Sequence, residues 1–143
     1  MWAEEIEAQK YMSRTLPQRS DQYFYSKESL LAWYVIRADN QNVGAVWLEK
    51  TAIDDEISVL GILIGKNDLL GQGIGEQAIN LSVEKSRDEI SFRSVHIYVR
   101  ESNIRAIRCY RKCGFVEIFR GTKLINGTIV IPFITMELRL YQL

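Results

Sequence analysis

Three glycines stand within five residues, at Gly71, Gly73 and Gly75, directly before a stretch with the pattern of an amphipathic helix. Because glycine has no Cβ, such a segment can turn tightly and expose consecutive backbone N–H groups. The positive end of the helix dipole adds to those groups. The pattern therefore favours binding of an anion, most naturally a pyrophosphate. The alternative is a flexible turn at the start of a helix.

The glycines do not fit two familiar phosphate-binding motifs. A P-loop needs Gly-Lys-Ser/Thr, whereas Gly75 is followed by Glu76 and Gln77. A dinucleotide fingerprint needs G-x-G-x-x-G, and the third glycine is misplaced from either starting glycine. If this segment binds a pyrophosphate, it does so as another kind of phosphate-binding loop.

A second motif closes the same stretch of chain. It reads Asn103-x-x-Ala106-x-x-x-Tyr110-x-x-x-Gly114-Phe115. Together with the glycines, it resembles the GCN5-related N-acetyltransferase (GNAT) superfamily, and in particular the aminoglycoside 6′-N-acetyltransferase branch. The glycine run resembles the pyrophosphate loop of that superfamily, Arg/Gln-x-x-Gly-x-Gly/Ala, except that Leu70 stands at the first position. The resemblance covers roughly residues 30–140.

The resemblance implies transfer of an acetyl group from acetyl-CoA, bound as a cosubstrate, to a primary amine. It implies a pyrophosphate on the glycine loop and a pantetheine arm along a strand. A backbone N–H near Ile64 could stabilise the negative charge that the thioester oxygen gains. The implied cofactor-binding residues are Leu63, Ile64, Gly71, Gln72, Gly73, Ile74, Gly75, Glu76, Asn103, Ala106 and Tyr110.

Tyr110 is the candidate general acid. A phenol within reach of the leaving thiolate can protonate it. Tyr110 falls on the inner stripe of a predicted helix and matches the tyrosine of the superfamily motif. The alternative is a core tyrosine whose hydroxyl is hydrogen-bonded.

Three adjacent carboxylates, at Asp54, Asp55 and Glu56, precede an apolar strand pattern. The superfamily often has an acidic residue at this place, so the resemblance implies Glu56 as the base or water relay for the attacking amine, with Asp55 as the second candidate. The cluster would also attract a cationic substrate. The alternative is a solvated acidic turn.

The residues alone do not determine which molecule accepts the acetyl group. The first candidate acceptor is a cationic small molecule such as an aminoglycoside or a polyamine, and the second is a peptide N-terminus or lysine. A third reading is a non-catalytic acyl-CoA-binding module. Tyr110 and the acidic cluster favour an enzyme over the third reading.

Length and composition narrow the class of protein. The chain has 143 residues, so we expect a single domain over residues 1–143. Eighteen acidic residues balance eighteen basic ones, which disfavours a nucleic-acid partner. We expect a soluble, cytoplasmic protein with no membrane partner, since no apolar run reaches the roughly 18 residues of a membrane span. Cys109 and Cys113 are expected to be packing thiols and not a metal site.

The hydrophobic pattern predicts a mixed α/β (α+β) fold around one central, mostly antiparallel sheet flanked by helices. The predicted strands are 33–36, 43–48, 57–64, 95–99, 115–123 and 128–139, and the predicted helices are 2–15, 27–31, 73–88 and 103–113. The GNAT resemblance adds a parallel strand pair that splays apart, with the acetyl-CoA arm in the gap.

Gly44 predicts a bulge or a close approach within its strand, and Pro132 an edge position or a bulge. Gly114 is expected to end the last helix, and Asn126-Gly127 predicts a type I′ turn. In the helix over 73–88, the inner face is predicted to carry Ile74, Ala78 and Leu81. His96, within the fourth strand, is more typical of a satisfied polar residue under a helix than of a base.

The first strand of the superfamily has no counterpart in the pattern before residue 15. We expect one of three situations: a sheet that is one strand short, a truncated start, or a homodimer in which a neighbouring chain covers that edge. The aromatic residues Tyr23, Phe24 and Tyr25 either line a substrate cleft or seal one end of the core.

Overall fold

The computed structural model describes residues 30–65 and 73–140. Within this part of the chain, six strands and two helices follow one another in the order β1 (Leu31–Ala38), β2 (Gln41–Glu49), β3 (Ile57–Ile64), α2 (Ile74–Ser86), β4 (Ser94–Arg100), α3 (Ile104–Lys112), β5 (Val116–Ile125) and β6 (Ile129–Arg139). The strands form one sheet in the order β1-β2-β3-β4-β6-β5. Only β3 and β4 are parallel neighbours, so the predicted fold class is confirmed.

Some of the predictions lie outside the described residues. They concern the helix over residues 2–15, the aromatic residues 23–25, and the positions of Gly71 and Gln72. One prediction nearby is wrong: Leu31, which we assigned to the end of a short helix, is the first residue of β1 and is buried against β2.

The first hairpin is closed by two residues that adopt the left-handed conformation. Asp39 and Asn40 have φ angles of 51° and 63°, which a type I′ turn requires. The register of β1 and β2 shifts by one residue after Ile36, so β2 carries a bulge beside Gly44. A Cβ on Gly44 would stand 2.2 Å from the Leu63 carbonyl oxygen. The predicted bulge or close approach at Gly44 is therefore confirmed, and both are present.

Pro132 does not lie at a sheet edge or a bulge, as we had expected. It is a residue of β6, which is flanked by β4 and β5, and it pairs with Thr122 of β5. The last pair between β4 and β6 is Arg100 with Phe133, so Pro132 lies just beyond the end of the β4 ladder. A missing N–H on that flank costs no ladder hydrogen bond, because β4 has ended.

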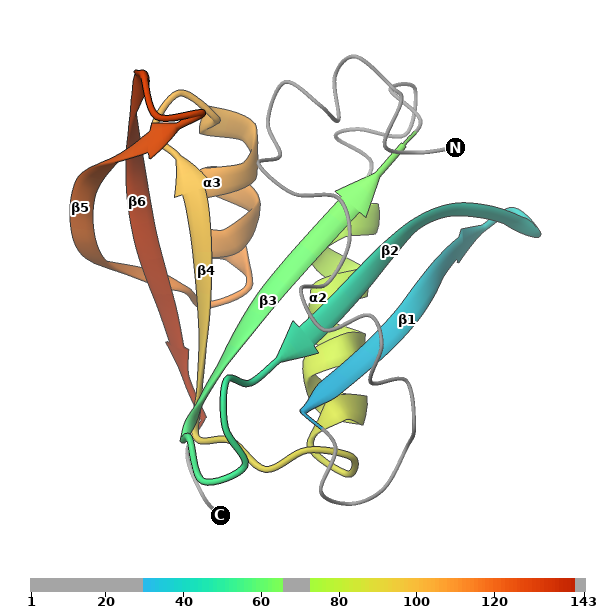
Figure 1. Cartoon of the computed structure of the whole chain (residues 1–143). Coiled ribbons are helices and arrows are strands. Elements are labelled where there is room, and N and C mark those ends of the chain that lie inside the picture. The colour runs from blue at the N-terminus through green and yellow to red at the C-terminus, as the bar shows by residue number, and fades with distance from the viewer. Residues whose placement is uncertain (1–29, 66–72, 141–143) are drawn as a thin grey trace.

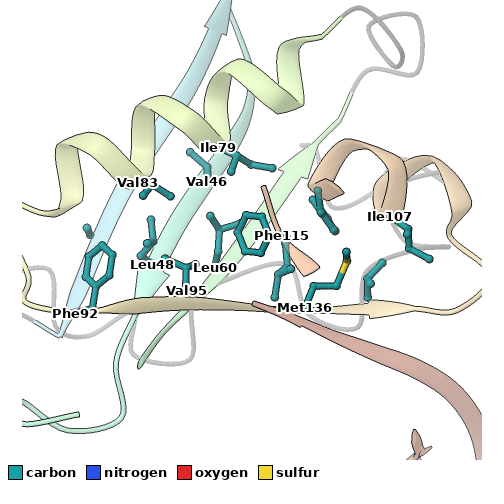
Figure 2. Close-up of a cluster of buried hydrophobic side chains, with 14 of the residues drawn as sticks. Val46, Leu48, Leu60, Ile79, Val83, Phe92, Val95, Ile107, Phe115 and Met136 are labelled. Atoms are coloured by element: carbon teal, nitrogen blue, oxygen red, sulfur yellow. The ribbon is translucent and has the colours of Figure 1, made fainter. Parts of the chain in front are cut away.

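Both helices cover the same face of the sheet and enclose the main core (Figure 1). Figure 2 shows labelled side chains of α2 and α3 converging there with side chains of β2, β3, β4 and β6. The buried face of α2 differs from the predicted one. Leu81 is 55% exposed, whereas Ser82 and Ser86 are buried. Each of these hydroxyls donates to the carbonyl three residues earlier, which removes the cost of burying it.

The C-terminal end of α3 fixes the position of Tyr110. The Gly114 N–H donates to the Arg111 carbonyl and the Phe115 N–H donates to the Tyr110 carbonyl, which together form a Schellman motif. Gly114 has a φ angle of 99°, so the predicted glycine terminator is confirmed. The rings of Tyr110 and Phe115 lie 6.2 Å apart and seal this end of the core.

The parallel pair β3–β4 is short. Only Ile57 with Ser94, Ser58 with Val95 and Val59 with His96 are paired. Beyond these pairs the two strands diverge, β3 toward β2 and β4 toward β6, and leave a V-shaped gap between their ends (Figure 1). The splayed strand pair that the resemblance implied is present.

A second cluster lies on the sheet face opposite the helices. Trp47 is fully buried and stacks on Trp33, with ring centroids 5.1 Å apart. Its indole occupies the space over Gly61, its partner in the β2–β3 register. A Cβ on Gly61 would stand 2.3 Å from the Trp47 ring, so the absence of a side chain at Gly61 determines how this face packs beside the gap.

We predict opposite effects for alanine at two glycines near the site. Gly61→Ala should lower the free energy of unfolding by about 1–3 kcal/mol, because Trp47 has no room to move. Gly75→Ala should change it little or raise it by up to about 1 kcal/mol, since its Cβ would meet only ordinary contacts and alanine favours a helix. Urea unfolding of both variants provides the measurement. Equal stability of the Gly61→Ala variant and the parent would contradict this packing.

Candidate functional site

The first turn of α2 directs backbone N–H groups toward its N-terminal end. Gly73 is the N-cap residue, has a φ angle of 78° and offers no side-chain cap. The first helical hydrogen bond runs from the Gln77 N–H to the Gly73 carbonyl, at 3.1 Å. Within the described residues, the N–H groups of Ile74, Gly75 and Glu76 therefore have no partner. Together with the helix dipole, these donors favour an anion.

A side chain at Gly73 would point into open space, because no atom lies within 4 Å of the position its Cβ would take. Gly75 is enclosed on the other side: its Cβ would stand 3.5 Å from the Cys109 sulfur and 3.7 Å from Ile64 Cδ1. The structure thus brings the α2 N-terminus, the end of β3 and the middle of α3 together. These are three of the segments that the resemblance assigned to acetyl-CoA.

The strand register decides which backbone groups of β3 face the gap. The Gly65 N–H donates to the Val43 carbonyl, so Gly65 turns its backbone toward β2. Residues two apart along a strand share this orientation, so the backbone groups of Leu63 also face β2. Those of Ile62 and Ile64 face the gap. Ile64 fits the predicted contact with a peptide-like arm, while Ile62 was missed and Leu63 contributes its side chain to the Trp47 cluster.

α3 presents two of the predicted cofactor-binding residues at its start. Asn103 Oδ1 accepts a hydrogen bond from the Ala106 N–H at 3.2 Å, so Asn103 is the N-cap of α3. This bond leaves the amide NH₂ of Asn103 as the group available to a ligand. Ala106 is half-buried and packs against the core.

Tyr110 belongs to the main core cluster and is only 7% exposed. No residue of the described part of the chain forms a hydrogen bond with its hydroxyl. Burial raises the pKa of the phenol above its ordinary value, and the thiols of Cys109 and Cys113 add to the rise. The phenol therefore holds its proton throughout the neutral range, which a proton donor needs.

Cys109 and Cys113 are free thiols between α3 and the first turn of α2. The Cys113 thiol lies 3.9 Å from the Glu76 carbonyl oxygen. A hydrogen bond from Cys113 lowers the pKa of Cys109, and the same bond raises the pKa of Cys113. No group of three or more potential metal ligands exists in residues 30–65 and 73–140. The two cysteines line the inner wall of the α2 N-terminus.

The predicted acidic cluster lies at the closed end of the gap, at the start of β3. Asp55 Oδ1 accepts from the Ile57 N–H at 3.0 Å, and Glu56 forms an ion pair with Arg93 at 3.6 Å. Glu56 and Ile64 are eight residues apart along one strand, roughly 26 Å. The structure therefore separates the carboxylates from the α2 N-terminus by the whole length of β3.

A pocket of about 660 Å³ opens at this closed end. Its charged side chains are four carboxylates and two guanidinium groups, so its formal charge at neutral pH is negative. The lining residues are Asp54, Asp55, Glu56, Ile57, Arg93, Ser94, Glu137, Arg139 and Leu140.

Glu137 was missed by sequence reasoning. It pairs with His96 across the β4–β6 ladder, and the His96 Nε2 atom lies 2.8 Å from Glu137 Oε2. The prediction that His96 is a satisfied polar residue is thus confirmed for one ring nitrogen. Its predicted place under a helix is wrong, because Val95 and Ile97 take the helix-covered face and His96 lies on the other. His96 and Glu137 are far apart in sequence. Only the alternation of polar and apolar residues along β6 indicates that the Glu137 side chain lies on the face away from the core.

The family comparison agrees with this geometry. Residues 2–115 match the model of the Acetyltransferase (GNAT) family. The chain belongs to that family.

Two curated proteins match this chain over part of its length. The chain is 29% identical over 102 residues to an uncharacterised protein of Methanocaldococcus jannaschii, a stretch covering 69% of this chain and 20% of that protein. It is 28% identical over 89 residues to the spermine/spermidine N(1)-acetyltransferase of Bacillus subtilis, covering 62% of this chain and 49% of the enzyme. The chain thus spans a fifth and about half of these two relatives.

Solved structures share the fold. A spermidine N-acetyltransferase from Vibrio cholerae in complex with CoA and spermine superposes with a TM-score of 0.65 at 22% identity, covering 77% of this chain and 66% of that one. An aminoglycoside acetyltransferase, AAC(6′)-Ib, in complex with coenzyme A superposes with a TM-score of 0.61 at 20% identity, covering 78% of this chain and 68% of that one.

Among the described residues, neither helix has the length and apolar character needed to cross a bilayer.

The raised pKa of Tyr110 predicts how stability changes in alkali. The unfolded phenol ionises near pH 10, whereas the folded phenol stays neutral. The folded state therefore binds one more proton above about pH 10, and its stability falls as the pH rises. Tyr110→Phe should make this alkaline loss shallower, as measured by urea unfolding at pH 8 to 11.

Tyr98→Phe is the matched control, because Tyr98 is 53% exposed and its removal should leave the slope unchanged. The same slope in both variants would mean that Tyr110 ionises freely in the folded protein.

Proposed function

We propose that the chain is an acetyl-CoA-dependent N-acetyltransferase that acts on the primary amine of a cationic small molecule. The observation that carries the proposal is the gap between β3 and β4, which has the unpaired amides of α2 at its open end. The family match supports the same activity. The acetyl thioester supplies an electrophilic carbonyl and a thiolate leaving group.

The chain's own groups fit the pyrophosphate and the pantetheine arm of acetyl-CoA. The N–H groups of residues 73–76 would hold the pyrophosphate, and the open space over Gly73 leaves room for it. The backbone groups of Ile62 and Ile64 would hold the pantetheine amides, as a strand partner would. The free NH₂ of Asn103 is a further donor at the start of α3.

Tyr110 is proposed as the donor to the leaving thiolate. A phenol with a raised pKa is a weaker acid than a thiol, whose ordinary pKa is about 8.5. Tyr110 would therefore stabilise the thiolate first by a hydrogen bond, and the proton would follow as the product leaves. An uncharged donor in the core also avoids the cost of burying an ion.

The acceptor would bind in the acidic pocket at the closed end. Its excess of carboxylates favours a molecule with several amines, and one similar chain is named a spermine/spermidine acetyltransferase. Asp54 and Asp55 would hold the remaining ammonium groups. Glu56 as base or water relay remains a hypothesis, which requires the reacting amine to lie at this end of β3.

The cofactor seat is tested by a charge introduced at Gly73. Gly73→Glu puts bulk and negative charge where the pyrophosphate would lie, so CoA binding measured by calorimetry should be lost. Gly127→Glu is the matched control, because Gly127 has a φ angle of 74°, no atom within 4 Å of its Cβ position, and a place in the distant β5–β6 turn. The control should bear the same backbone strain and bind CoA normally. Equal CoA affinity in both variants would refute the proposed seat.

The acceptor pocket is tested by salt and by charge removal. Electrostatic attraction is screened with a Debye length of about 10 Å at 0.1 M, so KM for spermidine should rise with ionic strength. Asp55→Asn should raise KM, whereas Glu56→Gln should mainly lower kcat if Glu56 takes the proton. Glu84→Gln, an exposed change on α2, is the control. A salt-independent KM and two silent pocket variants would make the cluster an ordinary solvated turn.

A further inference from the structure

We propose that His96 is the general base that accepts the proton of the attacking amine, and that Glu137 positions its ring. This proposal rests on the proposed acetyltransferase activity and concerns the same site. It assigns the proton transfer to a group at the point where the two parallel strands separate, in place of Glu56, which then only attracts the cationic acceptor.

His96 lies at that point of the sheet. Its pairing with Val59 is the last between β3 and β4, and beyond it the strands diverge. Its neighbours Val95 and Ile97 are buried in the core beneath the helices. Successive side chains of a strand alternate between faces, so the imidazole lies on the opposite face.

The hydrogen bond to Glu137 determines which ring nitrogen can accept a proton. An ionised carboxylate is only an acceptor, so Nε2 must carry the hydrogen in the bond between His96 and Glu137. In the neutral imidazole, Nδ1 then has a free lone pair. Among the described residues, Nδ1 has no hydrogen-bond partner. One nitrogen is therefore fixed in position and the other has a free lone pair, on a side chain that is 13% exposed.

Glu137 stays ionised because two cationic or donor groups hold its oxygens. Arg139 Nε lies 2.7 Å from Oε1 and His96 Nε2 lies 2.8 Å from Oε2. The hydrogen bond of Arg139, followed by that of His96, lowers the pKa of Glu137. A fixed negative charge beside Nε2 stabilises the imidazolium that forms when Nδ1 takes a proton, as in other histidine–carboxylate pairs.

The acceptor pocket reaches Glu137, and His96 lies directly behind that carboxylate, outside the pocket lining. The side chain of Glu137 lines the pocket and also bonds His96, and the pair of Ile57 with Ser94 at the strand starts lines it too. Glu56 is three residues from Val59, roughly 10 Å along β3. A polyamine held by the acidic cluster could thus extend one amine toward the separation point. The proposed thioester would enter the same point from the open end of the gap.

The proposed reaction forms one carbon–nitrogen bond, breaks one carbon–sulfur bond and transfers protons. Nδ1 of His96 takes one proton from the ammonium group, the neutral nitrogen then forms a bond to the thioester carbonyl carbon, and its second surplus proton is lost to solvent. The carbon–sulfur bond breaks, and the thiolate receives a proton from Tyr110 or from solvent. His96 then releases its proton to solvent, and the phenol is reprotonated. No oxidant or reductant is involved.

Among the described residues, charged or titratable groups from three strands share the face of the sheet on which His96 lies. From β6, Glu137 faces it directly and Arg139 stands behind that carboxylate. From β4, Tyr98 and Arg100 share its face of the sheet by strand alternation. On β3 its partner Val59 is uncharged, and Val59 in turn pairs with Glu49 of β2, a buried carboxylate on the same face. Of these groups, only Glu137 has a hydrogen bond to the ring.

His96 is the only histidine in the chain, which makes it observable without substitution. Using tag-free wild-type protein, the imidazole is titrated by NMR, and kcat/KM for spermidine is measured over the same pH range. The acid limb of the kinetic profile should have the same midpoint as the NMR titration. Carbethoxylation with diethylpyrocarbonate should inactivate the enzyme, and spermidine should protect it.

Two variants complete the test. His96→Gln can still donate to Glu137 but cannot take a proton, so kcat should fall about 10²–10⁴-fold with CoA affinity unchanged. That loss should shrink as the pH approaches about 10, where the amine deprotonates by itself. Glu137→Gln can keep a hydrogen bond to the ring but removes the charge beside it, so kcat should fall while KM for spermidine changes little.

The outcomes separate this proposal from the function it rests on. If wild-type protein binds CoA and acetylates spermidine, but His96→Gln keeps the wild-type rate and pH profile, His96 is a structural residue and the inference fails alone. An acid limb that does not follow the imidazole titration has the same meaning. If wild-type protein acetylates no amine in a panel of polyamines, aminoglycosides and peptides, the proposed function itself fails, and this inference fails with it.

Discussion

The early end of the β3–β4 ladder is the constraint on which the site depends. After Val59 and His96 the two parallel strands separate, although each remains paired to its other neighbour. Backbone N–H and C=O groups need partners, and a sheet interrupted in its middle leaves some of them facing a gap. A peptide-like arm can supply those partners. The same interruption places the N-terminus of α2 at one end of the gap and an acidic pocket at the other.

The two ends of the gap differ in charge, and this difference orders the proposed reaction. Unpaired amides and the helix dipole favour an anion at the open end, whereas an excess of carboxylates favours cations at the closed end. His96 and Glu137 lie between them, at the point of separation. A phosphate-bearing donor and a polyamine acceptor would therefore enter from opposite ends and meet where a base is available.

Local chemistry was predictable from the sequence, and long-range pairing was not. Gly114 as a helix terminator and the tight turn at Asn126 and Gly127 follow from residue conformations that only a few residue types tolerate. Tyr110 on the inner stripe of its helix follows from the spacing of apolar residues. The buried face of α2 was wrong at Leu81, because buried serines can bond to their own helix and so take core positions. The partnership of His96 with Glu137 and the orientation of Ile62 both depend on strand register, which no local pattern encodes.

The most direct test of the account is an NMR titration of the backbone amides of the whole protein with CoA. The account predicts the largest shifts at the amides of Ile74, Gly75 and Glu76, followed by Ile62 and Ile64 on the gap side of β3. Leu63, whose amide belongs to the β2 ladder, should shift less than either neighbour. Largest shifts on the β5–β6 hairpin, or equal shifts along all three β3 residues, would contradict a cofactor that lies between the separated strands.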